Sequence, residues 1–346
     1  MPSLLIITQS DHDPASRFRA MQYLPYFRSA GWEVTHHVYS PTLYRKKWFS
    51  SGPLSQLENI LTNLYRRAKS FPIFYHADRY DIVIVSREIP CLQKLLVARA
   101  RHLIVDVDDD ICTGSQAPSI VELFKSATMI VAGNGILAQK IRIHNPATII
   151  IPTVVDVQSY TTPSSDFSSG SFRIGWLGSP YSVKETLGPV MNMLAELQNR
   201  YNFEFVIVSS QPEAVPQSRL QWRFISWSPS VETKIAELFD VGIMPLQDIP
   251  THRSKCGCKL LQYMAAGLPA IASPIGINRE IMEHGVTGLY ATTATEWAEA
   301  IGALMGDRAL CREMGSVARE RVSQAYSCDH GASLWLKVLN DVIKSR

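Results

Sequence analysis

The feature that most constrains the fold of this chain is a regular alternation of short apolar runs with longer helical stretches. Ser3–Thr8 is an apolar run, a polar loop follows, residues 17–27 have apolar side chains at helical spacing, and a new run begins after Gly31. This order predicts strand, loop, helix and strand, the opening unit of a parallel sheet. Gly31 stands where a glycine commonly ends a helix. The chain therefore begins as an α/β protein.

The same alternation continues to about residue 151, pauses, and then restarts at Phe172. Further strands of the first half are predicted at residues 82–85, 103–107, 129–132 and 148–151. The pause is rich in small polar residues and has no apolar period, which predicts a linker. A length of 346 residues agrees with two domains at roughly 150 residues each.

We therefore predict an α/β chain of two doubly wound Rossmann-like domains. The predicted parts are a first domain at 1–155, a linker at 156–171, a second domain at 172–328, and a C-terminal helix at 329–346 that packs back on the first domain. Ligands of open parallel sheets bind beyond the carboxyl ends of the strands. We therefore expect the two domains to face one another across a central cleft.

Composition excludes several classes of protein. Hydrophobic residues make up 46% of the chain and charged residues 19%, which is typical of a folded protein and not of a disordered one. No run approaches the roughly 18 apolar residues of a membrane span. The N-terminus lacks the basic region and cleavage site of a signal peptide, and the six cysteines are scattered, so we expect a cytoplasmic protein with reduced thiols.

Charge is distributed unevenly along the chain. Residues 1–105 contain 14 Lys and Arg against 7 Asp and Glu, whereas the whole chain has a net charge of +3, so the remainder is acidic. A basic first half suggests an anionic partner such as a phospholipid surface, a lipid diphosphate or nucleic acid, or else only a solvated basic face. Basic and aromatic residues at 44–49 precede an amphipathic stretch at 54–69, as in interfacial segments. A packed helix with a basic outer face explains the same pattern.

The most informative motif follows an apolar strand at 241–246. A loop leads to Gly257, and a helix begins at Cys258. A glycine at a helix start allows a ligand to approach the backbone, and the helix dipole favours an anion such as a diphosphate. Lys255 and Lys259 flank this start and supply positive charge. Gln262 lies about one turn further along, where its amide can bond a sugar hydroxyl.

The segment Lys255-Cys-Gly-Cys-Lys-Leu-Leu-Gln-Tyr-Met-Ala-Ala-Gly-Leu-Pro269, with Ala272-Ser-Pro-Ile-Gly276 and Glu283-His-Gly-Val-Thr-Gly-Leu289, resembles the nucleotide-sugar-binding half of GT-B glycosyltransferases, family 4 in particular. The resemblance is strong over residues 172–325 and weaker before them. It implies transfer of a sugar, with retention of configuration, from a nucleotide diphosphate sugar to a glycan or lipid-linked acceptor in surface polysaccharide or glycoconjugate synthesis. It also implies no metal, no other cofactor and no nucleic acid partner.

The resemblance further implies a set of site residues. Members of that family typically carry two glutamates separated by seven residues, and the matching positions here are Ser254 and Gln262. The family's Arg and Lys after the first strand of this domain correspond to the region of Gly178, Ser179 and Lys184. The expected donor-binding residues are therefore Gly178, Ser179, Lys184, Ser254, Gly257, Cys258 and Gln262, with Lys255 and Lys259 at the leaving diphosphate.

In the first domain, four acids stand within five residues at Asp106-Val-Asp-Asp-Asp110, directly after an apolar run. Asp108 or Asp109 can contact an acceptor hydroxyl or the reacting sugar and assist deprotonation. Carboxylates that hold Mg²⁺, or a helix cap with solvated acids, are the alternatives. Arg17 and Arg19 are read as the start of the first helix, where cations are unfavourable, so we expect them to serve the acceptor or else to lie on the surface.

Two other functions stay open from the sequence. A catalytically silent protein that binds nucleotide sugars agrees with the absence of both glutamates, and a sugar-nucleotide epimerase uses the same fold. A dehydrogenase is disfavoured because no Gly-x-Gly-x-x-Gly follows a strand with an acid at the required distance.

Overall fold

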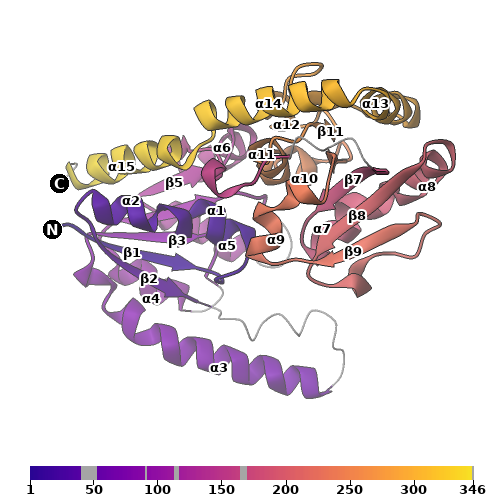
Figure 1. Ribbon diagram of the computed structural model, residues 1–346. Helices are drawn as coiled ribbons and strands as arrows, with labels where there is room; N and C mark the ends of the chain where they lie inside the picture. The colour runs from indigo at the N-terminus through magenta and orange to yellow at the C-terminus, as the bar shows by residue number, and fades with distance from the viewer. Residues whose placement is uncertain (40–52, 90–91, 113–116, 164–169, 345–346) are drawn as a thin grey trace. The chain divides into compact units, whose positions relative to one another are not determined.

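The computed structural model describes residues 1–39, 53–89, 92–112, 117–163 and 170–344. It divides into two compact units, Met1–Thr153 with Cys328–Arg346, and Val154–Ser327. Each unit contains a six-stranded sheet with helices around it (Figure 1). All registered strand pairs are parallel. The predicted class, an α/β chain with two doubly wound sheets, is confirmed.

The sheet of the first unit has the order β2-β1-β3-β4-β5-β6. Its strands are β1 (Ser3–Thr8), β2 (Glu33–Val38), β3 (Ile82–Ser86), β4 (Leu103–Val107), β5 (Met129–Ala132) and β6 (Thr148–Ile150). Both β3 and β4 are buried over their whole length, which explains why nearly all of their side chains are apolar; Asp106 of β4 is the charged exception. The strand order reverses between β1 and β3, and this reversal is the switch point of the sheet.

The helices of the first unit are α1 (Pro14–Arg19), α2 (Leu24–Ser29), α3 (Pro53–Tyr75), α4 (Gln93–Arg99), α5 (Ala117–Ser126), α6 (Gly135–Arg142) and α15 (Cys328–Lys344). The single helix predicted at 17–27 is wrong, because a 3₁₀ turn at Met21–Tyr23 separates α1 from α2. The first helix also begins earlier than predicted. Asp13 caps it by accepting a hydrogen bond from the Ser16 amide, and Pro14 opens it.

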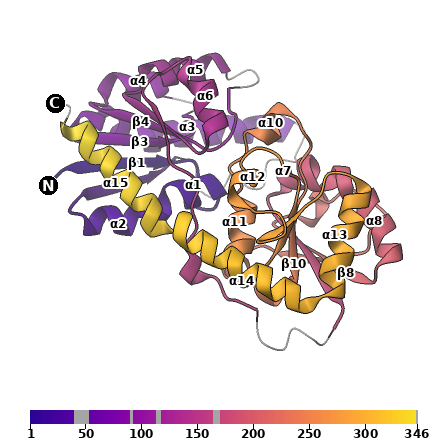
Figure 2. The same cartoon turned by 90° about the horizontal axis from the view of Figure 1, so that it is seen from above.

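The C-terminal helix α15 completes the first unit, where it packs against α2 (Figure 2). Trp335 of this helix is buried, and its ring centroid lies 6.4 Å from that of Tyr23. At the start of the helix, Cys328 Sγ lies 3.2 Å from Gln22 Oε1. None of the described helices is long and apolar enough to span a bilayer.

A buried histidine joins β2 to α3 and predicts a pH dependence of stability. His37 is 4% exposed, and its Nε2 lies 3.0 Å from Ser70 Oγ. Burial, with the Lys69 charge second, lowers the pKa of His37 to about 4. An unfolded histidine titrates near 6.5, so the unfolded chain binds more protons between pH 6.5 and 4. We expect the free energy of unfolding to decrease as the pH is lowered through this window.

The measurement is urea unfolding of the chain and of His37→Gln at pH 7, 5.5 and 4.5. The substitution should flatten the decrease in stability, whereas His12→Gln, at a side chain 39% exposed, should leave it in place. Equal slopes in all three proteins would contradict a buried, neutral His37.

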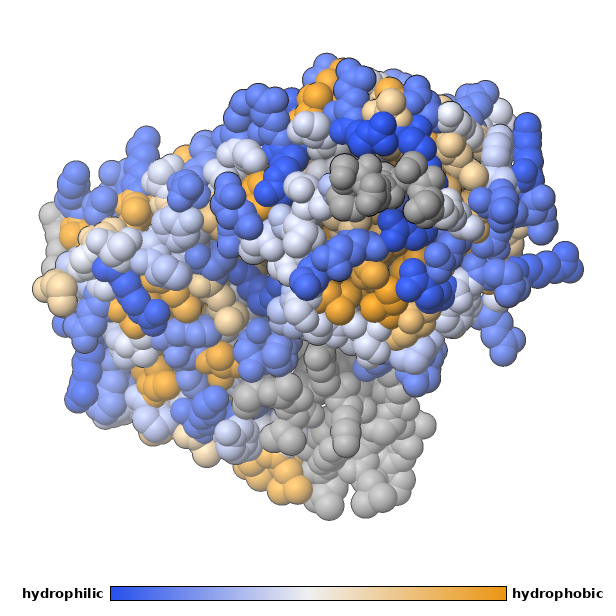
Figure 3. Space-filling view, in the orientation of Figure 1, coloured by the Kyte–Doolittle hydropathy of each residue, from blue (hydrophilic) through white to orange (hydrophobic). Residues whose placement is uncertain are grey.

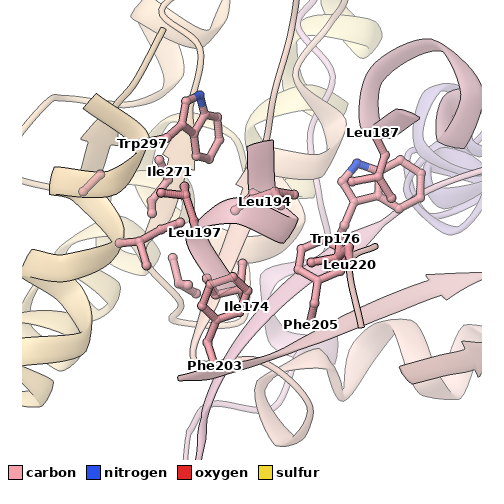
Figure 4. Packing of buried hydrophobic residues seen from close by; sticks show 14 of the residues in the cluster. Ile174, Trp176, Leu187, Leu194, Leu197, Phe203, Phe205, Leu220, Ile271 and Trp297 are labelled. Carbon is pink, nitrogen blue, oxygen red and sulfur yellow. The ribbon is translucent and has the colours of Figure 1, made fainter. Parts of the chain in front are cut away.

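The sheet of the second unit has the order β12-β11-β10-β7-β8-β9. Its strands are β7 (Phe172–Leu177), β8 (Phe203–Ser209), β9 (Trp222–Ser226), β10 (Val241–Met244), β11 (Ala270–Ala272) and β12 (Gly288–Tyr290). Renumbered within the unit, this is the 3-2-1-4-5-6 order of dinucleotide-binding folds, with its switch point between β7 and β10. Ile174 and Phe205 of the sheet belong to the same core as Leu194 and Trp297 of the helices (Figure 4).

The helices of the second unit are α7 (Pro180–Ser182), α8 (Met191–Arg200), α9 (Pro229–Thr233), α10 (Pro250–Arg253), α11 (Cys258–Ala265), α12 (Asn278–Ile281), α13 (Ala294–Gly306) and α14 (Arg308–Ala325). The apolar spacing of residues 183–200 and of residues 231–239 predicts one helix in each segment. Both predictions are wrong. A π turn at Val183–Leu187 and a 3₁₀ turn at Gly188–Val190 precede α8, because Pro189 has no amide to continue an α-helix. In the second segment, α9 already ends at Thr233.

The described part of the predicted linker, up to residue 163, is packed on the second unit. Arg319 of α14 donates hydrogen bonds to the carbonyl oxygens of Val157, at 3.0 Å, and Tyr160, at 3.2 Å. The amide of Thr161 donates to the carbonyl of Thr233 at 2.9 Å. Residues 164–169 lie outside the described residues. The boundary between the two compact units follows Thr153, so residues 154–163 belong to the second unit.

Candidate functional site

The switch point of the second unit lies where β7 and β10 diverge. Their register ends at Gly175 and Gly242, and beyond it the hydroxyl of Tyr263 bridges the two strands. This hydroxyl accepts from the Leu177 amide at 3.0 Å and donates to the Ile243 carbonyl at 3.3 Å. Ligands of such sheets bind outside the strand ends at this point. The loops that leave β7 and β10 carry the residues predicted to bind a donor.

The loop after β7 contains three of the predicted residues. The Gly178 amide donates to the Val208 carbonyl at 3.0 Å, which fixes the loop to the neighbouring strand. Ser179 caps α7, because its hydroxyl accepts a hydrogen bond from the Ser182 amide at 3.2 Å. Lys184 is exposed in the π turn that follows. Ser179 is therefore engaged in local structure, and Lys184 is accessible.

Lys259 of α11 lies against the loop after β7. Its Nζ is 5.0 Å from the centroid of the Trp176 ring, within cation–π range. A Cβ atom on Gly178 would lie 2.4 Å from Trp176 Cη2 and 2.8 Å from Lys259 Cε. Only glycine fits at 178 without displacing the aromatic ring or the lysine stem. The structure thus brings together Gly178 and Lys259, which are 81 positions apart in the sequence.

Gly257 begins α11 in the left-handed conformation, with φ of 69°. A Cβ atom at this position would lie 2.2 Å from Ile281 Cδ1. Both facts explain the glycine, because other residues rarely adopt this φ and the neighbouring helix α12 leaves no room. The next residue, Cys258, is half-buried, and its Sγ lies 3.8 Å from Gln262 Oε1. Lys255, also half-buried, precedes this turn.

The two positions that match the family's glutamates, Ser254 and Gln262, are buried in the protein, and both side chains have hydrogen-bond partners within it. Gln262 is 5% exposed, and its Nε2 donates to the Tyr160 hydroxyl at 3.4 Å. Ser254 is fully buried, and its hydroxyl donates to the Pro250 carbonyl at 3.0 Å. The physical reason is that residue 160, in the predicted linker, returns to α11 and covers the face on which Gln262 lies.

His252 is a residue of this loop that the sequence reasoning did not assign to the site. It is 1% exposed, and the Gln247 amide donates to its Nδ1 at 3.0 Å. Burial, and then the charge of Lys255, lower its pKa. The imidazole is therefore neutral and holds the start of the loop against α10. The sequence around His252 contains no pattern that predicts its burial or its contact with the Gln247 amide.

The switch point of the first unit is occupied by Arg87, which directly follows β3. Its φ is 67°, a conformation that is uncommon for a residue other than glycine. Its amide donates to the Asp106 carbonyl at 2.7 Å, and its Nε donates to Asp108 Oδ1, also at 2.7 Å. The sequence reasoning missed Arg87. The sequence did contain a signal for a site residue here, because the charged residues Arg87 and Glu88 closely follow the apolar run of the predicted strand.

Cations neutralise three of the four acids at the end of β4. Asp106 forms a buried two-point ion pair with Arg19, at 2.5 and 3.1 Å. Asp110 pairs with Lys140 at 2.7 Å. Burial raises the pKa of Asp108, but the charge and hydrogen bond of Arg87 outweigh burial, so the net pKa lies below its usual range.

Asp109 is the remaining acid of this group. Its Oδ1 accepts from the Asp110 amide at 3.0 Å, and no ion pair involves it within the described residues. It lines a cavity of about 240 Å³, together with Val107, Asp110, Ile111, Cys112, Phe124, Leu137, Lys140, Ile141, Ile143 and His144. In the described parts of the chain, no group of three His, Cys, Asp or Glu residues is placed to hold a metal. Asp109 is thus the carboxylate most available to a ligand.

The prediction for Arg17 and Arg19 rested on a wrong helix start. Both lie in the last turn of α1, where a cation is favourable, because Asp13 and Pro14 begin the helix earlier. Arg19 is 2% exposed and also donates to the Ile151 carbonyl at 2.7 Å, so it is a structural residue and not an acceptor contact. Arg17 is half-buried, with its guanidinium 5.0 Å from the Phe18 ring centroid.

Comparison with known proteins places this geometry in a family. Residues 171–307 match the family described as Glycosyl transferases group 1, and this span contains all the predicted donor-binding residues. This part of the second unit is therefore similar to the group 1 glycosyl transferases. Among curated members with local similarity, an N-acetyl-alpha-D-glucosaminyl L-malate synthase of Bacillus anthracis is 29% identical over 115 residues, 33% of this chain. A D-inositol 3-phosphate glycosyltransferase of Nocardia farcinica is 33% identical over 69 residues, 19% of this chain.

The matched segments span only 30% and 15% of these two transferases. Solved structures cover the chain more fully. Sucrose-phosphate synthase of Thermosynechococcus elongatus has a TM-score of 0.71 at 15% identity, over 100% of both chains. HepE of Anabaena, in complex with UDP, has a TM-score of 0.69 at 17% identity, over 99% of this chain and 100% of its own. At such identities the likeness shows the two-domain GT-B fold alone.

Proposed function

We propose that this chain is a retaining glycosyltransferase that moves a sugar from a nucleotide diphosphate sugar to a glycan or lipid-linked acceptor, in surface polysaccharide or glycoconjugate synthesis. The observation that carries the proposal is the approach of Lys259 to Gly178 at the switch point of the second unit. Two related structures support the donor class, because HepE was solved in complex with UDP and with UDP-glucose.

In this proposal, electrostatic attraction at the start of α11 binds the diphosphate of the donor. The helix dipole and backbone amides after Gly257 attract the diphosphate, and Lys255 and Lys259 neutralise its charge as the sugar departs. Lys259 already lies over Trp176 beside the strand end, so little side-chain freedom is lost on binding. With two lysines and a helix terminus at the diphosphate, we propose that the reaction proceeds without a metal or other cofactor.

On the acceptor side, we assign the two adjacent acids different roles. Arg87 holds Asp108 and lowers its pKa, which makes Asp108 a poor proton acceptor. Asp109 lies beside the 240 Å³ cavity and has no ion-pair partner among the described residues. We propose that Asp109 contacts the acceptor hydroxyl and that Arg87 and Asp108 position it.

This assignment predicts unequal effects of two neighbouring substitutions. Asp109→Asn should lower kcat for transfer by about 10²–10⁴-fold, the usual contribution of a positioned acid or base. Asp108→Asn should have a smaller effect on kcat, because Asp108 acts through Arg87. Affinity for the nucleotide should be unchanged in both. Initial rates over a range of acceptor concentrations measure the split, and equal kcat values for Asp109→Asn and the unmodified chain would reject Asp109.

The experiment that tests the function begins with titration calorimetry using UDP, GDP and ADP, in the presence and absence of EDTA. Transfer from UDP-glucose and other sugar nucleotides is then assayed with a panel of glycan and lipid-linked acceptors. A silent binding protein is favoured by the burial of Ser254 and Gln262, and it would bind a nucleotide without turnover on any acceptor. An epimerase would convert the donor sugar with no acceptor present. Absence of nucleotide binding would reject all three functions.

A further inference from the structure

The outer face of α3 exposes more large apolar side chains than any other described helix. Six of them between residues 60 and 75 are 42–58% exposed, namely Ile60, Leu61, Leu64, Tyr65, Phe71 and Tyr75. The opposite face of the same helix packs on its unit through Arg66, Ser70 and Phe74, which are buried. The helix is therefore anchored on one side and apolar toward solvent on the other.

These side chains form one stripe along the helix. Leu61, Leu64, Phe71 and Tyr75, with Ala68 between them, are spaced by three or four residues, which places them in one line over about 20 Å of helix length. The same periodicity places Ile60 and Tyr65 on either side of this line. Single exposed apolar residues are ordinary on a protein surface, but a continuous stripe marks an interaction site. Figure 3 shows hydrophobic side chains over α3 at the lower edge of the view.

The charges within the stripe segment are all positive. Residues 60–75 contain no acid, and Arg67 and Lys69 are exposed beside the apolar side chains. At the end of the stripe, the guanidinium of Arg99 from α4 lies 4.4 Å from the centroid of the Tyr75 ring and also forms an ion pair with Asp78 at 3.6 Å. An apolar face bordered by cations is the pattern of helices that lie in the interface of an anionic bilayer.

We propose that this stripe, defined as the six exposed apolar residues of α3, docks the chain on the surface of an anionic phospholipid membrane. The inference rests on the surface alone and does not depend on the proposed transferase activity. Charge decides between a bilayer and a second copy of the chain. A two-fold contact of the stripe with itself would bring Arg67 and Lys69 of both copies together, whereas anionic lipid headgroups neutralise them.

The test is sedimentation of the full chain with vesicles of phosphatidylcholine alone and of phosphatidylcholine with phosphatidylglycerol in a ratio of about 3:1. We expect binding to the anionic vesicles, at least tenfold weaker binding to the neutral ones, and loss of most binding in about 0.5 M NaCl, where charges are screened. No sedimentation with anionic vesicles would overturn the proposal. So would equal binding to both kinds of vesicle.

Substitutions locate the contact. Leu61→Ser with Leu64→Ser should weaken vesicle binding at least tenfold by removing apolar area, and Arg67→Glu should weaken it about tenfold by reversing a charge. The matched controls are Ile143→Ser, at a single apolar residue 80% exposed, and Lys125→Glu on exposed α5, which should both bind like the unmodified chain. Melting curves establish that each variant is folded.

Two further outcomes would overturn the inference. One is equal weakening by the control substitutions, which would mean that binding is not specific to α3. The other is a dimer in sedimentation velocity without lipid that the two leucine substitutions abolish, which would assign the stripe to a second copy. UDP affinity, measured on the same variants, should not change, so failure of the membrane contact and failure of the donor site are distinguishable.

Discussion

A chain in which Arg19 is replaced by methionine is expected to lose about 3–5 kcal/mol of unfolding free energy, the cost of leaving one member of a buried ion pair alone. Arg19 and Asp106 are both 2% exposed and joined by two hydrogen bonds, and Arg19 also bonds the Ile151 carbonyl. Without the guanidinium, the carboxylate is buried with no opposite charge, and a carbonyl loses its donor. Urea unfolding at pH 7 measures the loss.

The free energy of unfolding of Arg19→Met, measured as a function of pH, gives a second test of the buried ion pair. Burial already raises the pKa of the folded Asp106, and the charge and hydrogen bonds of Arg19 oppose this rise. In Arg19→Met the pKa should rise further above that of the unfolded chain, near 3.9, so the loss of stability should shrink as pH falls toward 4. The double variant Arg19→Met with Asp106→Leu should recover most of the stability, because two apolar groups replace the ion pair. A single variant as stable as the unmodified chain would contradict the buried pair.

Lys259→Met is expected to weaken UDP binding by about 1–3 kcal/mol, which corresponds to roughly tenfold to hundredfold in Kd, the scale of a lost charge-assisted hydrogen bond. Methionine keeps most of the apolar stem that lies against Trp176 and Gly178, so the fold should change little. Titration calorimetry with UDP provides the measurement, and a melting curve establishes that the variant is folded.

The matched control for Lys259 is Lys234→Met, at an exposed lysine of the same unit that lies at the end of α9. Its UDP affinity should equal that of the unmodified chain. The same loss in both variants would mean that only the overall charge of the unit matters. No loss in Lys259→Met would remove this residue from the donor site, and with it the main support for the proposed function.

Elements with continuous apolar runs were predictable from the sequence. Strands β1, β4 and β5 begin and end as predicted, because a strand buried on both faces is mostly apolar. Elements that contain proline were predicted less well. The sequence of residues 17–27 and 183–200 follows a helical apolar period, yet Pro25 and Pro189 coincide with breaks into shorter helices and turns. Strand β12, only three residues long, gave no such run.

In the candidate site, too, some features were predictable from the sequence and others were not. Gly257 and the start of α11 were predictable, because a left-handed turn before a helix requires glycine. The partners of the charged residues were not. Arg19 pairs with Asp106 across 87 positions, and Gln262 meets Tyr160 across 102, separations at which local pattern gives no information. For the same reason, Arg87 was missed although it lies next to Asp108.

By itself the sequence determined the class of fold, the start of α11 and the resemblance of the second unit to a known family, because these depend on local periodicity and on short motifs. Only the tertiary structure decided which acid is neutralised and which remains for a ligand, which arginine is structural, and that one face of α3 stays apolar toward solvent. Ion pairs and burial depend on groups brought together by folding, and their energy is set by the local dielectric and by distance, which a linear pattern does not contain.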